Sequence, residues 1–273
     1  MAAPAPRPDR SPDFEVRRSP LALPSLARPV FDGDAQVGNR SCRVRSLTGP
    51  DGEYLEVSGA GRFAIPRGGG RIDLDPEPGA TEEAVTEALL GPAFALALAR
   101  TGTFLLHGSA VILPDRGAAG FLGDSGAGKS TLARLLTEAG GEAALAADDL
   151  LAVALTAEGA EVVPHVPQLK LDPAAMAAIA GLPPRIPLAG LYALVPAPPK
   201  AAVEIGEPLP PAGATALLVH HTIASILFAE DLLAAHFGFV ADLAGRVPLR
   251  RLAVPRRLDV GAEVLRNLTR RGT

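Results

Sequence analysis

The sequence predicts an α/β protein with a small β-rich module ahead of its α/β part. Two patterns along the chain lead to this prediction. Between Tyr54 and Leu74, short β-prone segments alternate with glycine and proline, which is typical of a small antiparallel layer. After Thr81, which can cap a helix, longer strand and helix segments alternate, which is typical of α/β domains. A chain of 273 residues with 48% hydrophobic content can supply the core that such a fold needs.

Changes in composition divide the chain into three regions. Residues 1–30 mix prolines with arginines and are predicted to be a disordered tail, and residues 31–84 are predicted to form the β-rich N-terminal module. Residues 85–273 are predicted to form the α/β domain. The apolar stretch at 89–106 is interrupted by Pro92, Arg100 and Gly102, so it predicts a buried helix that leads into a strand rather than a membrane span.

Charge and cysteine content exclude several classes of partner. The chain has 26 basic and 30 acidic residues, for a formal net charge of -4, so it lacks the positive field that attracts nucleic acid or an anionic membrane. We therefore expect neither partner. A single cysteine, Cys42, rules out an internal disulfide and predicts a reducing, cytoplasmic location.

The segment GDSGAGKST, residues 123–131, is the most informative motif of the chain. It follows the strand-like segment AAGFLG and precedes the helix-like segment STLARLLTEAG. Gly123-x-x-x-x-Gly128-Lys129-Ser130 matches the complete phosphate-binding loop pattern, in which backbone N–H groups and a helix N-terminus cradle phosphate oxygens. The residues predicted to bind the nucleotide are Gly123, Asp124, Ser125, Gly126, Ala127, Gly128, Lys129, Ser130 and Thr131.

Three side chains of this loop have separate predicted roles. Lys129 reaches the β and γ phosphates, Ser130 holds Mg²⁺, and Thr131 meets the α phosphate in the first helical turn. The predicted cofactors are therefore ATP and Mg²⁺.

Two adjacent carboxylates, Asp148 and Asp149, lie in the middle of the apolar run EAALAADDLLAV, about twenty residues after the loop lysine. Carboxylates in an apolar strand are costly unless a cation or a donor compensates them. We predict that one aspartate binds the Mg²⁺ of the nucleotide and that the other acts as a general base. A pair of aspartates in a helix cap or loop is the alternative.

A histidine and a glycine, His107 and Gly108, lie at the start of a predicted strand in the segment LLHGSAVIL, upstream of the loop. By itself a lone histidine is more often a structural residue. His107–Gly108, GDSGAGKST and Ala147-Asp148-Asp149, in this order and spacing, resemble the catalytic core of the HPr kinase/phosphorylase family and its shorter relatives. The resemblance implies a P-loop kinase core of the HPr-kinase type.

The same resemblance implies roles for individual residues. It places His107 near the transferring phosphate and Lys129 and Ser130 on phosphates and Mg²⁺. Asp148 and Asp149 share the base and metal duties, and we favour Asp148 as base and Asp149 as metal ligand. The predicted catalytic residues are thus His107, Lys129, Asp148 and Asp149, and the predicted metal ligands are Ser130 and Asp149.

The resemblance also implies a reaction, the phosphorylation of a serine hydroxyl of a peptide or protein by an ATP-dependent serine kinase. Shorter members of the family are encoded with ribosomally made peptides, lasso-peptide precursors among them, and such a precursor is the leading acceptor. An HPr-type protein serine kinase, a small-molecule kinase and a non-catalytic nucleotide-binding regulatory subunit are the alternatives. The sequence leaves the oligomeric state open, a homo-oligomer included.

Two further groups of residues are predicted to be structural. The remaining histidines lack the spacing and the companions of a metal site; they are His165, His220, His221 and His236. The segment 222–245 is predicted to form a helix with an apolar face in the core; that face contains Ile223, Ile226, Leu227 and Leu233.

Overall fold

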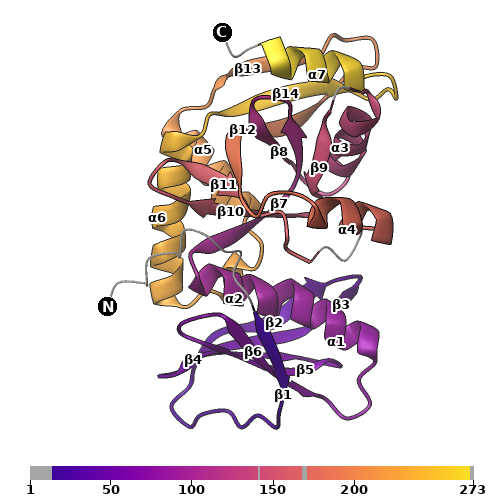
Figure 1. The fold of residues 1–273 in the computed structure, drawn as a ribbon. Helices are drawn as coiled ribbons and strands as arrows, with labels where there is room; N and C mark the ends of the chain where they lie inside the picture. Colours follow the sequence, from indigo (N-terminus) through magenta and orange to yellow (C-terminus); the bar gives the residue numbers. More distant parts are fainter. Residues whose placement is uncertain (1–13, 141, 168–170, 271–273) are drawn as a thin grey trace. The chain divides into compact units, whose positions relative to one another are not determined.

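A computed structural model describes residues 14–140, 142–167 and 171–270 of the chain, a mixed α/β structure that divides into two units (Figure 1). The first unit contains residues 14–104 together with 223–237. The second contains the described residues of 105–222 and 238–270. None of the described helices is both long enough and apolar enough to cross a membrane.

The first unit is built on a six-stranded sheet, whose strands are indigo to purple in Figure 1. Its strand order is β1-β6-β5-β4-β3-β2, with successive strands antiparallel from β2 to β6 and with β1 parallel to β6. The strands are β1 (Glu15–Arg18), β2 (Arg28–Val37), β3 (Arg40–Thr48), β4 (Gly52–Val57), β5 (Gly61–Pro66) and β6 (Arg71–Pro76). The antiparallel strands predicted between Tyr54 and Leu74 are confirmed as β4, β5 and β6.

Two short helices joined by a kink follow this sheet. Helix α1 (Glu82–Ala88) is capped at its N-terminus by Thr81, whose hydroxyl accepts a hydrogen bond from the backbone N–H of Ala84 at 3.2 Å. A π-helical turn, η1 (Leu89–Ala93), contains Pro92 and leads into α2 (Phe94–Arg100). Helix α2 packs on β5 and β6 and is followed by strand β7 (Thr103–Leu113), so the predicted buried helix leading into a strand is confirmed.

The observed units differ from the predicted regions at both ends of the β-rich module. Within the predicted tail, β1 pairs with β6 and β2 begins at Arg28, because the β6 edge offers backbone partners to residues 15–18. The first unit also continues beyond residue 84 to Phe104, since the apolar helix α2 covers the sheet. Residues 1–13 of the tail lie outside the described residues.

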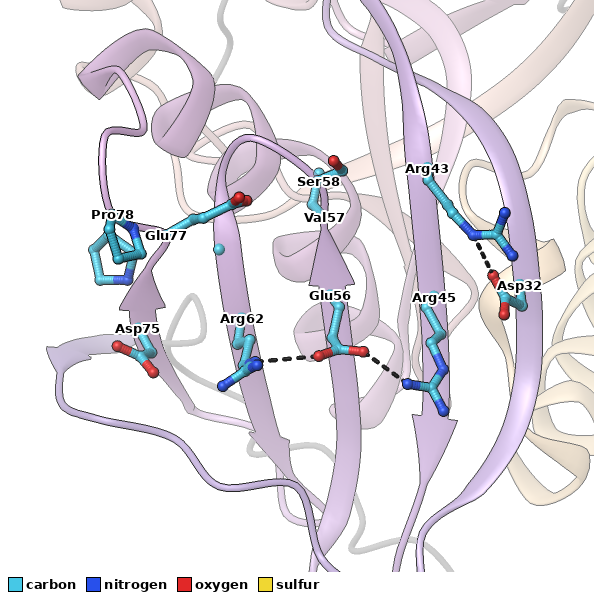
Figure 2. Close-up of a pocket in the computed structure, with 12 residues that line it drawn as sticks. Asp32, Arg43, Arg45, Glu56, Val57, Ser58, Arg62, Asp75, Glu77 and Pro78 are labelled. Atoms are coloured by element: carbon cyan, nitrogen blue, oxygen red, sulfur yellow. Dashed lines mark hydrogen bonds and ion pairs between the residues drawn. The ribbon is translucent and has the colours of Figure 1, made fainter.

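A charged hollow on this sheet is lined by ion pairs that cross neighbouring strands (Figure 2). Arg43 pairs with Asp32 at 2.9 Å. Arg45 and Arg62 both pair with Glu56, at 3.0 Å and 3.1 Å. Because these guanidinium groups already have carboxylate partners, we do not take the hollow as a phosphate site.

The segment after residue 222 corrects one prediction. A 3-10 turn, η2 (Ser225–Leu227), precedes helix α6 (Glu230–Arg246), so the chain does not form one continuous helix from residue 222. Ile226 and Leu233 are 61% and 49% exposed, whereas Leu227 is buried. The predicted apolar face is therefore wrong for Ile226 and Leu233, because the turn breaks the helical phase on which it depended.

The second unit contains an eight-stranded sheet with both parallel and antiparallel pairs. Its order is β11-β10-β7-β8-β12-β14-β13, with β9 paired to β7 and with a further pairing of β11 to β12. Strand β12 is parallel to both β8 and β14, which lie on either side of it. Strands β7 and β8 form an antiparallel hairpin. Besides β7, the strands are β8 (Gly117–Leu122), β9 (Ala144–Ala147), β10 (Leu150–Leu155), β11 (Ala160–Val162), β12 (Ile186–Ala197), β13 (Glu204–Pro208) and β14 (Leu249–Pro255).

Helices α3 (Lys129–Glu138) and α7 (Gly261–Arg270) pack against each other beside this sheet. A Cβ atom on Gly261 would lie 2.3 Å from the carbonyl oxygen of Leu135, so glycine permits the close approach of the two helices. The core under them contains Val111, Phe121, Leu132, Leu136, Leu252, Val264 and Leu268. The unit also contains α4 (Pro173–Ala180), α5 (Pro211–His221) and the end of α6.

Candidate nucleotide-binding site

The glycine-rich loop connects the end of β8 to the start of α3, the strand–loop–helix order that the sequence predicts. Gly126 and Gly128 have φ angles of 78° and 98°, in the left-handed region that side chains with a Cβ atom rarely adopt. Gly128 is the residue before the first turn of α3. These two glycines therefore let the backbone turn into the helix N-terminus, where unpaired N–H groups favour an anion.

Lys129 is the most buried polar residue of the loop region, with 6% of its surface exposed. Its ammonium group donates to the carbonyl oxygens of Gly123 and Asp124, at 2.6 Å and 3.1 Å. It also lies 3.0 Å from Nε2 of His107. These three contacts hold the charge inside the loop.

His107 connects the lysine to one of the two aspartates. Because Lys129 can only donate, Nε2 of His107 accepts, and its proton therefore lies on Nδ1. Nδ1 is 3.3 Å from Oδ1 of Asp149, a distance that fits a weak hydrogen bond from the Nδ1–H group to the carboxylate. The structure thus brings together three of the predicted catalytic residues, in the order Lys129, His107, Asp149.

The two aspartates form a turn between strands. The sequence predicts one apolar strand through this region, but β9 ends at Ala147 and β10 begins at Leu150. Asp149 has a φ angle of 74°, a conformation that aspartate tolerates better than apolar residues. Oδ1 of Asp148 accepts a hydrogen bond of 2.7 Å from the hydroxyl of the buried Ser109 on β7.

Gly108 lies between His107 and Ser109 at a point of close packing. A Cβ atom there would lie 2.8 Å from the carbonyl oxygen of Phe121 and 2.9 Å from a methyl group of Leu122. A larger residue at this position would push β7 away from β8, the strand that leads into the loop. The glycine of the His-Gly pair is therefore explained by packing.

The other predicted nucleotide-binding residues surround the start of α3. Ser130 and Thr131, in its first turn, are exposed, as are Asp124, Ser125 and Gly126 in the loop. Ala127 and Gly128 are half-buried. The hydroxyl groups and the loop backbone are thus accessible to a ligand.

A pocket of about 360 Å³ next to the loop was missed by the sequence prediction. Loop residues 126–128 and Leu135 of α3 form one part of its lining. The rest of the lining comes from the end of β12 and from the segment after β14, and includes Leu194, Val195, Pro196, Arg256, Arg257 and Leu258. These segments are far apart in the sequence and carry no local motif, so only the fold brings them to the loop.

Two histidines at the end of α5 lie beside the first part of the loop. Nε2 of His220 is 3.0 Å from Oδ1 of Asp124, and this hydrogen bond lowers the pKa of Asp124. Burial lowers the pKa of His221 to about 4, so its imidazole is neutral at pH 7. The expectation that no remaining histidine has metal-site companions is wrong for this pair, because the ligand atoms of Asp124, His220 and His221 lie within 4.8 Å of one another.

The two other histidines have structural surroundings. His165 is exposed and lies 3.0 Å from the carbonyl oxygen of Leu182. His236 is buried, with its ring centroid 5.3 Å from that of Phe104 and 5.5 Å from that of Phe228.

Comparison with known proteins gives limited information. No protein-family model matches the chain. No curated protein matches it either. Among solved structures, the chain is similar to the Hpr(Ser) kinase/phosphatase from Coxiella burnetii, with 15% sequence identity and a TM-score of 0.32 over 61% of this chain and 95% of that chain. Similarity of this size carries no information about activity, so the function must be inferred from the site itself.

Proposed function

We propose that the protein is an ATP- and Mg²⁺-dependent kinase that phosphorylates a serine hydroxyl of a peptide or protein. One observation carries the proposal: the buried ammonium group of Lys129 contacts both the phosphate-binding loop and His107, which in turn faces Asp149. A loop that only bound a nucleotide would not need its lysine connected to a histidine and a carboxylate. A phosphoryl-transfer site needs such groups around the γ phosphate.

The phosphates would lie against the loop backbone and the N-terminus of α3, and the nucleoside would lie in the adjacent pocket. Aliphatic side chains at Leu135 and Leu194 give that pocket apolar walls, which suit a planar base. Leu258, at its rim, is 75% exposed, and a bound base would cover it. Arg256 adds positive charge to the lining, whereas Arg257, also in the lining, is paired with Asp259 and Glu263.

Magnesium fits the oxygen ligands that surround the loop. The hydroxyl of Ser130 and the carboxylate of Asp149 are the ligands that we assign to it, since Mg²⁺ prefers carboxylate, phosphate and water oxygens. Bound there, it would neutralise charge that develops on the phosphate oxygens. In the proposed transfer the serine oxygen bonds to the γ phosphorus, the bond to the leaving ADP oxygen breaks, and the hydroxyl proton passes to Asp148.

The acceptor is a proposal that depends on the sequence resemblance. A serine of a ribosomally made precursor peptide, as in lasso-peptide systems, is the leading candidate. An HPr-type protein substrate and a small hydroxyl compound are the competing acceptors. A regulatory subunit that binds nucleotide without turnover is the competing class of function, and the contact between His107 and Asp149 favours the kinase over it.

The decisive experiment compares nucleotide binding with phosphoryl transfer. Binding of ATP·Mg²⁺ is measured by calorimetry, and transfer is measured with serine-containing peptides, candidate proteins and small hydroxyl compounds. We expect Lys129→Ala to weaken binding or abolish transfer, and Asp148→Asn to leave binding nearly intact while it lowers turnover by roughly 10²- to 10⁴-fold. Asp149→Asn should weaken the Mg²⁺-dependent part of the binding.

Asp242→Asn is the matched control, because Asp242 is an exposed aspartate on α6 that forms an ion pair with Arg246 at 3.6 Å and to which we assign no part in the reaction. This substitution should change neither the binding of ATP·Mg²⁺ nor the rate of phosphoryl transfer. If the wild type binds ATP but phosphorylates none of these acceptors, and neither site aspartate affects binding, the regulatory-subunit alternative replaces the kinase.

A further inference from the structure

Three potential metal ligands gather where the C-terminal end of α5 meets the start of the glycine-rich loop. They are the carboxylate of Asp124 and the imidazoles of His220 and His221, and their ligand atoms all lie within 4.8 Å of one another. The Asp124 and His220 positions are 96 residues apart in the sequence, yet Oδ1 of one is 3.0 Å from Nε2 of the other. The two imidazole rings meet edge to face, with centroids 4.7 Å apart.

These separations suit a tetrahedral cation. With zinc–ligand bonds of about 2.0–2.2 Å, the ligand atoms of a tetrahedral site lie roughly 3.3 Å apart. The observed separations, which include 3.0 Å between Asp124 and His220, need small side-chain rotations to reach that value. The exposed side chains of Asp124 and His220 are free of the packing that would prevent such rotations, with 81% and 66% of their surfaces exposed.

We propose that Asp124, His220 and His221 form a binding site for a divalent transition-metal cation of the Zn²⁺ type, with three protein ligands and a fourth position open to solvent. Two imidazoles and one carboxylate are a common ligand set for zinc. The same set discriminates against Mg²⁺, which prefers oxygen ligands. This site is therefore separate from the Mg²⁺ position proposed on Ser130 and Asp149.

The surroundings contain positive charges that oppose the cation and two features that favour it. The positive charge of Lys129 is close enough to His221 to disfavour a second positive charge there. The negative charge of Asp124 offsets it. In addition, α5 ends at His221, and the C-terminus of a helix carries a partial negative charge that stabilises cations.

His221 is the buried ligand of the site, and Asp124 and His220 are its exposed ligands. His221 is 6% exposed and belongs to the end of a helix, so its imidazole is held in place. A cation bound to all three residues would fasten the first part of the phosphate-binding loop to α5. The site needs no nucleotide, so it goes beyond the proposed kinase function and can be tested without it.

The test is a Zn²⁺ titration of the full, chelator-treated chain against a competing chromogenic indicator, in the absence of nucleotide. We expect one Zn²⁺ to bind in the wild type, and to bind at least ~100-fold more weakly to His220→Ala and to Asp124→Asn, because loss of even an outer-shell partner costs 10- to 100-fold. Both substitutions are at exposed side chains, so both variants should fold.

His165→Ala and Cys42→Ser are the controls, since they remove other exposed or half-exposed zinc ligands. Both should retain the wild-type affinity. The proposal is overturned if the wild type binds no Zn²⁺, if His220→Ala binds it as the wild type does, or if millimolar Mg²⁺ displaces it. Loss of binding in a control variant and not in His220→Ala would also overturn it, because the cation would then lie elsewhere.

Discussion

Replacement of Arg100 by methionine is the sharpest test of how the first unit is stabilised. Arg100 donates to Oε2 of Glu53 at 2.7 Å and also contacts Oε1 of the same carboxylate. Glu53 is completely buried, and the Arg100 side chain is 9% exposed. A second carboxylate, Asp231, accepts from Arg100 at 2.8 Å and from Arg67 at 2.8 Å.

The expected loss of stability depends on which cationic partners each carboxylate keeps in the variant. Without Arg100, Glu53 is a buried charge whose compensating cation is gone, and breaking such a pair costs about 3–5 kcal/mol. That is a large part of the ~5–15 kcal/mol that stabilises a typical domain. Asp231 is half-exposed and retains its ion pair with Arg67, so the change at this carboxylate costs little stability. The pKa of Asp231, which the hydrogen bond from Arg100 lowers to about 2, should rise in the variant. Adding Glu53→Gln should recover part of the loss, because a buried neutral amide costs less than a buried charge.

Tyrosine fluorescence gives an assay for this unit alone. The chain has two tyrosines and no tryptophan. Tyr54 lies on β4 next to Glu53, and Tyr192 lies on β12 of the second unit. In a Tyr192→Phe background, urea unfolding followed by tyrosine emission therefore reports on Tyr54.

Arg62→Met is the matched control, since Arg62 pairs with Glu56 on the same sheet but is 50% exposed. It should cost no more than about 1 kcal/mol. A loss below 1 kcal/mol for Arg100→Met, or no recovery on adding Glu53→Gln, would refute the view that this buried pair stabilises the unit by mutual compensation.

Two further predictions concern packing and pH. Gly108→Ala should destabilise the second unit by about 1–3 kcal/mol, because the new methyl group meets the carbonyl oxygen of Phe121. Gly213→Ala on α5 is the control: open space surrounds this position, so the substitution should be neutral or stabilising. Urea unfolding measures the stability of both variants. In chelator-treated protein, the free energy of unfolding should fall as the pH falls from 6.5 to about 4. The protonation of His221 should account for up to ~3 kcal/mol of this decrease. Burial lowers the pKa of His221 to about 4 and lowers that of His236, so the unfolded chain binds more protons in this range; a flat pH profile would contradict the prediction.

The glycine-rich loop could be predicted from the sequence because its requirements are local. Left-handed glycines, a lysine and a hydroxyl at fixed spacing between a strand and a helix are all readable within a short segment. The same holds for Thr81, whose capping hydrogen bond lies within one helical turn. In these places local backbone chemistry decides the structure, and tertiary packing does not override it.

The pocket beside the loop and the histidine pair could not be predicted in this way. The pocket combines Leu194 at the end of β12 with Leu258 after β14, and these segments become neighbours because β12 and β14 pair in parallel. His220 reaches Asp124 only because α5 ends beside the loop. Neither arrangement leaves a periodic or spaced pattern in the sequence.

The turn at Asp148 and Asp149 decides how two adjacent carboxylates can serve one site. In a continuous strand, neighbouring side chains point to opposite faces, which would separate the two carboxylates. Their partners, Ser109 and His107, are two residues apart on β7 and therefore lie on the same face of that strand. The turn thus brings both carboxylates to one face of β7, while the Cα of Gly108 between the partners faces the opposite side, where a Cβ atom would meet Phe121, Leu122 and Leu151. This common face is the physical reason to expect that Asp148→Asn and Asp149→Asn affect one reaction through two different steps.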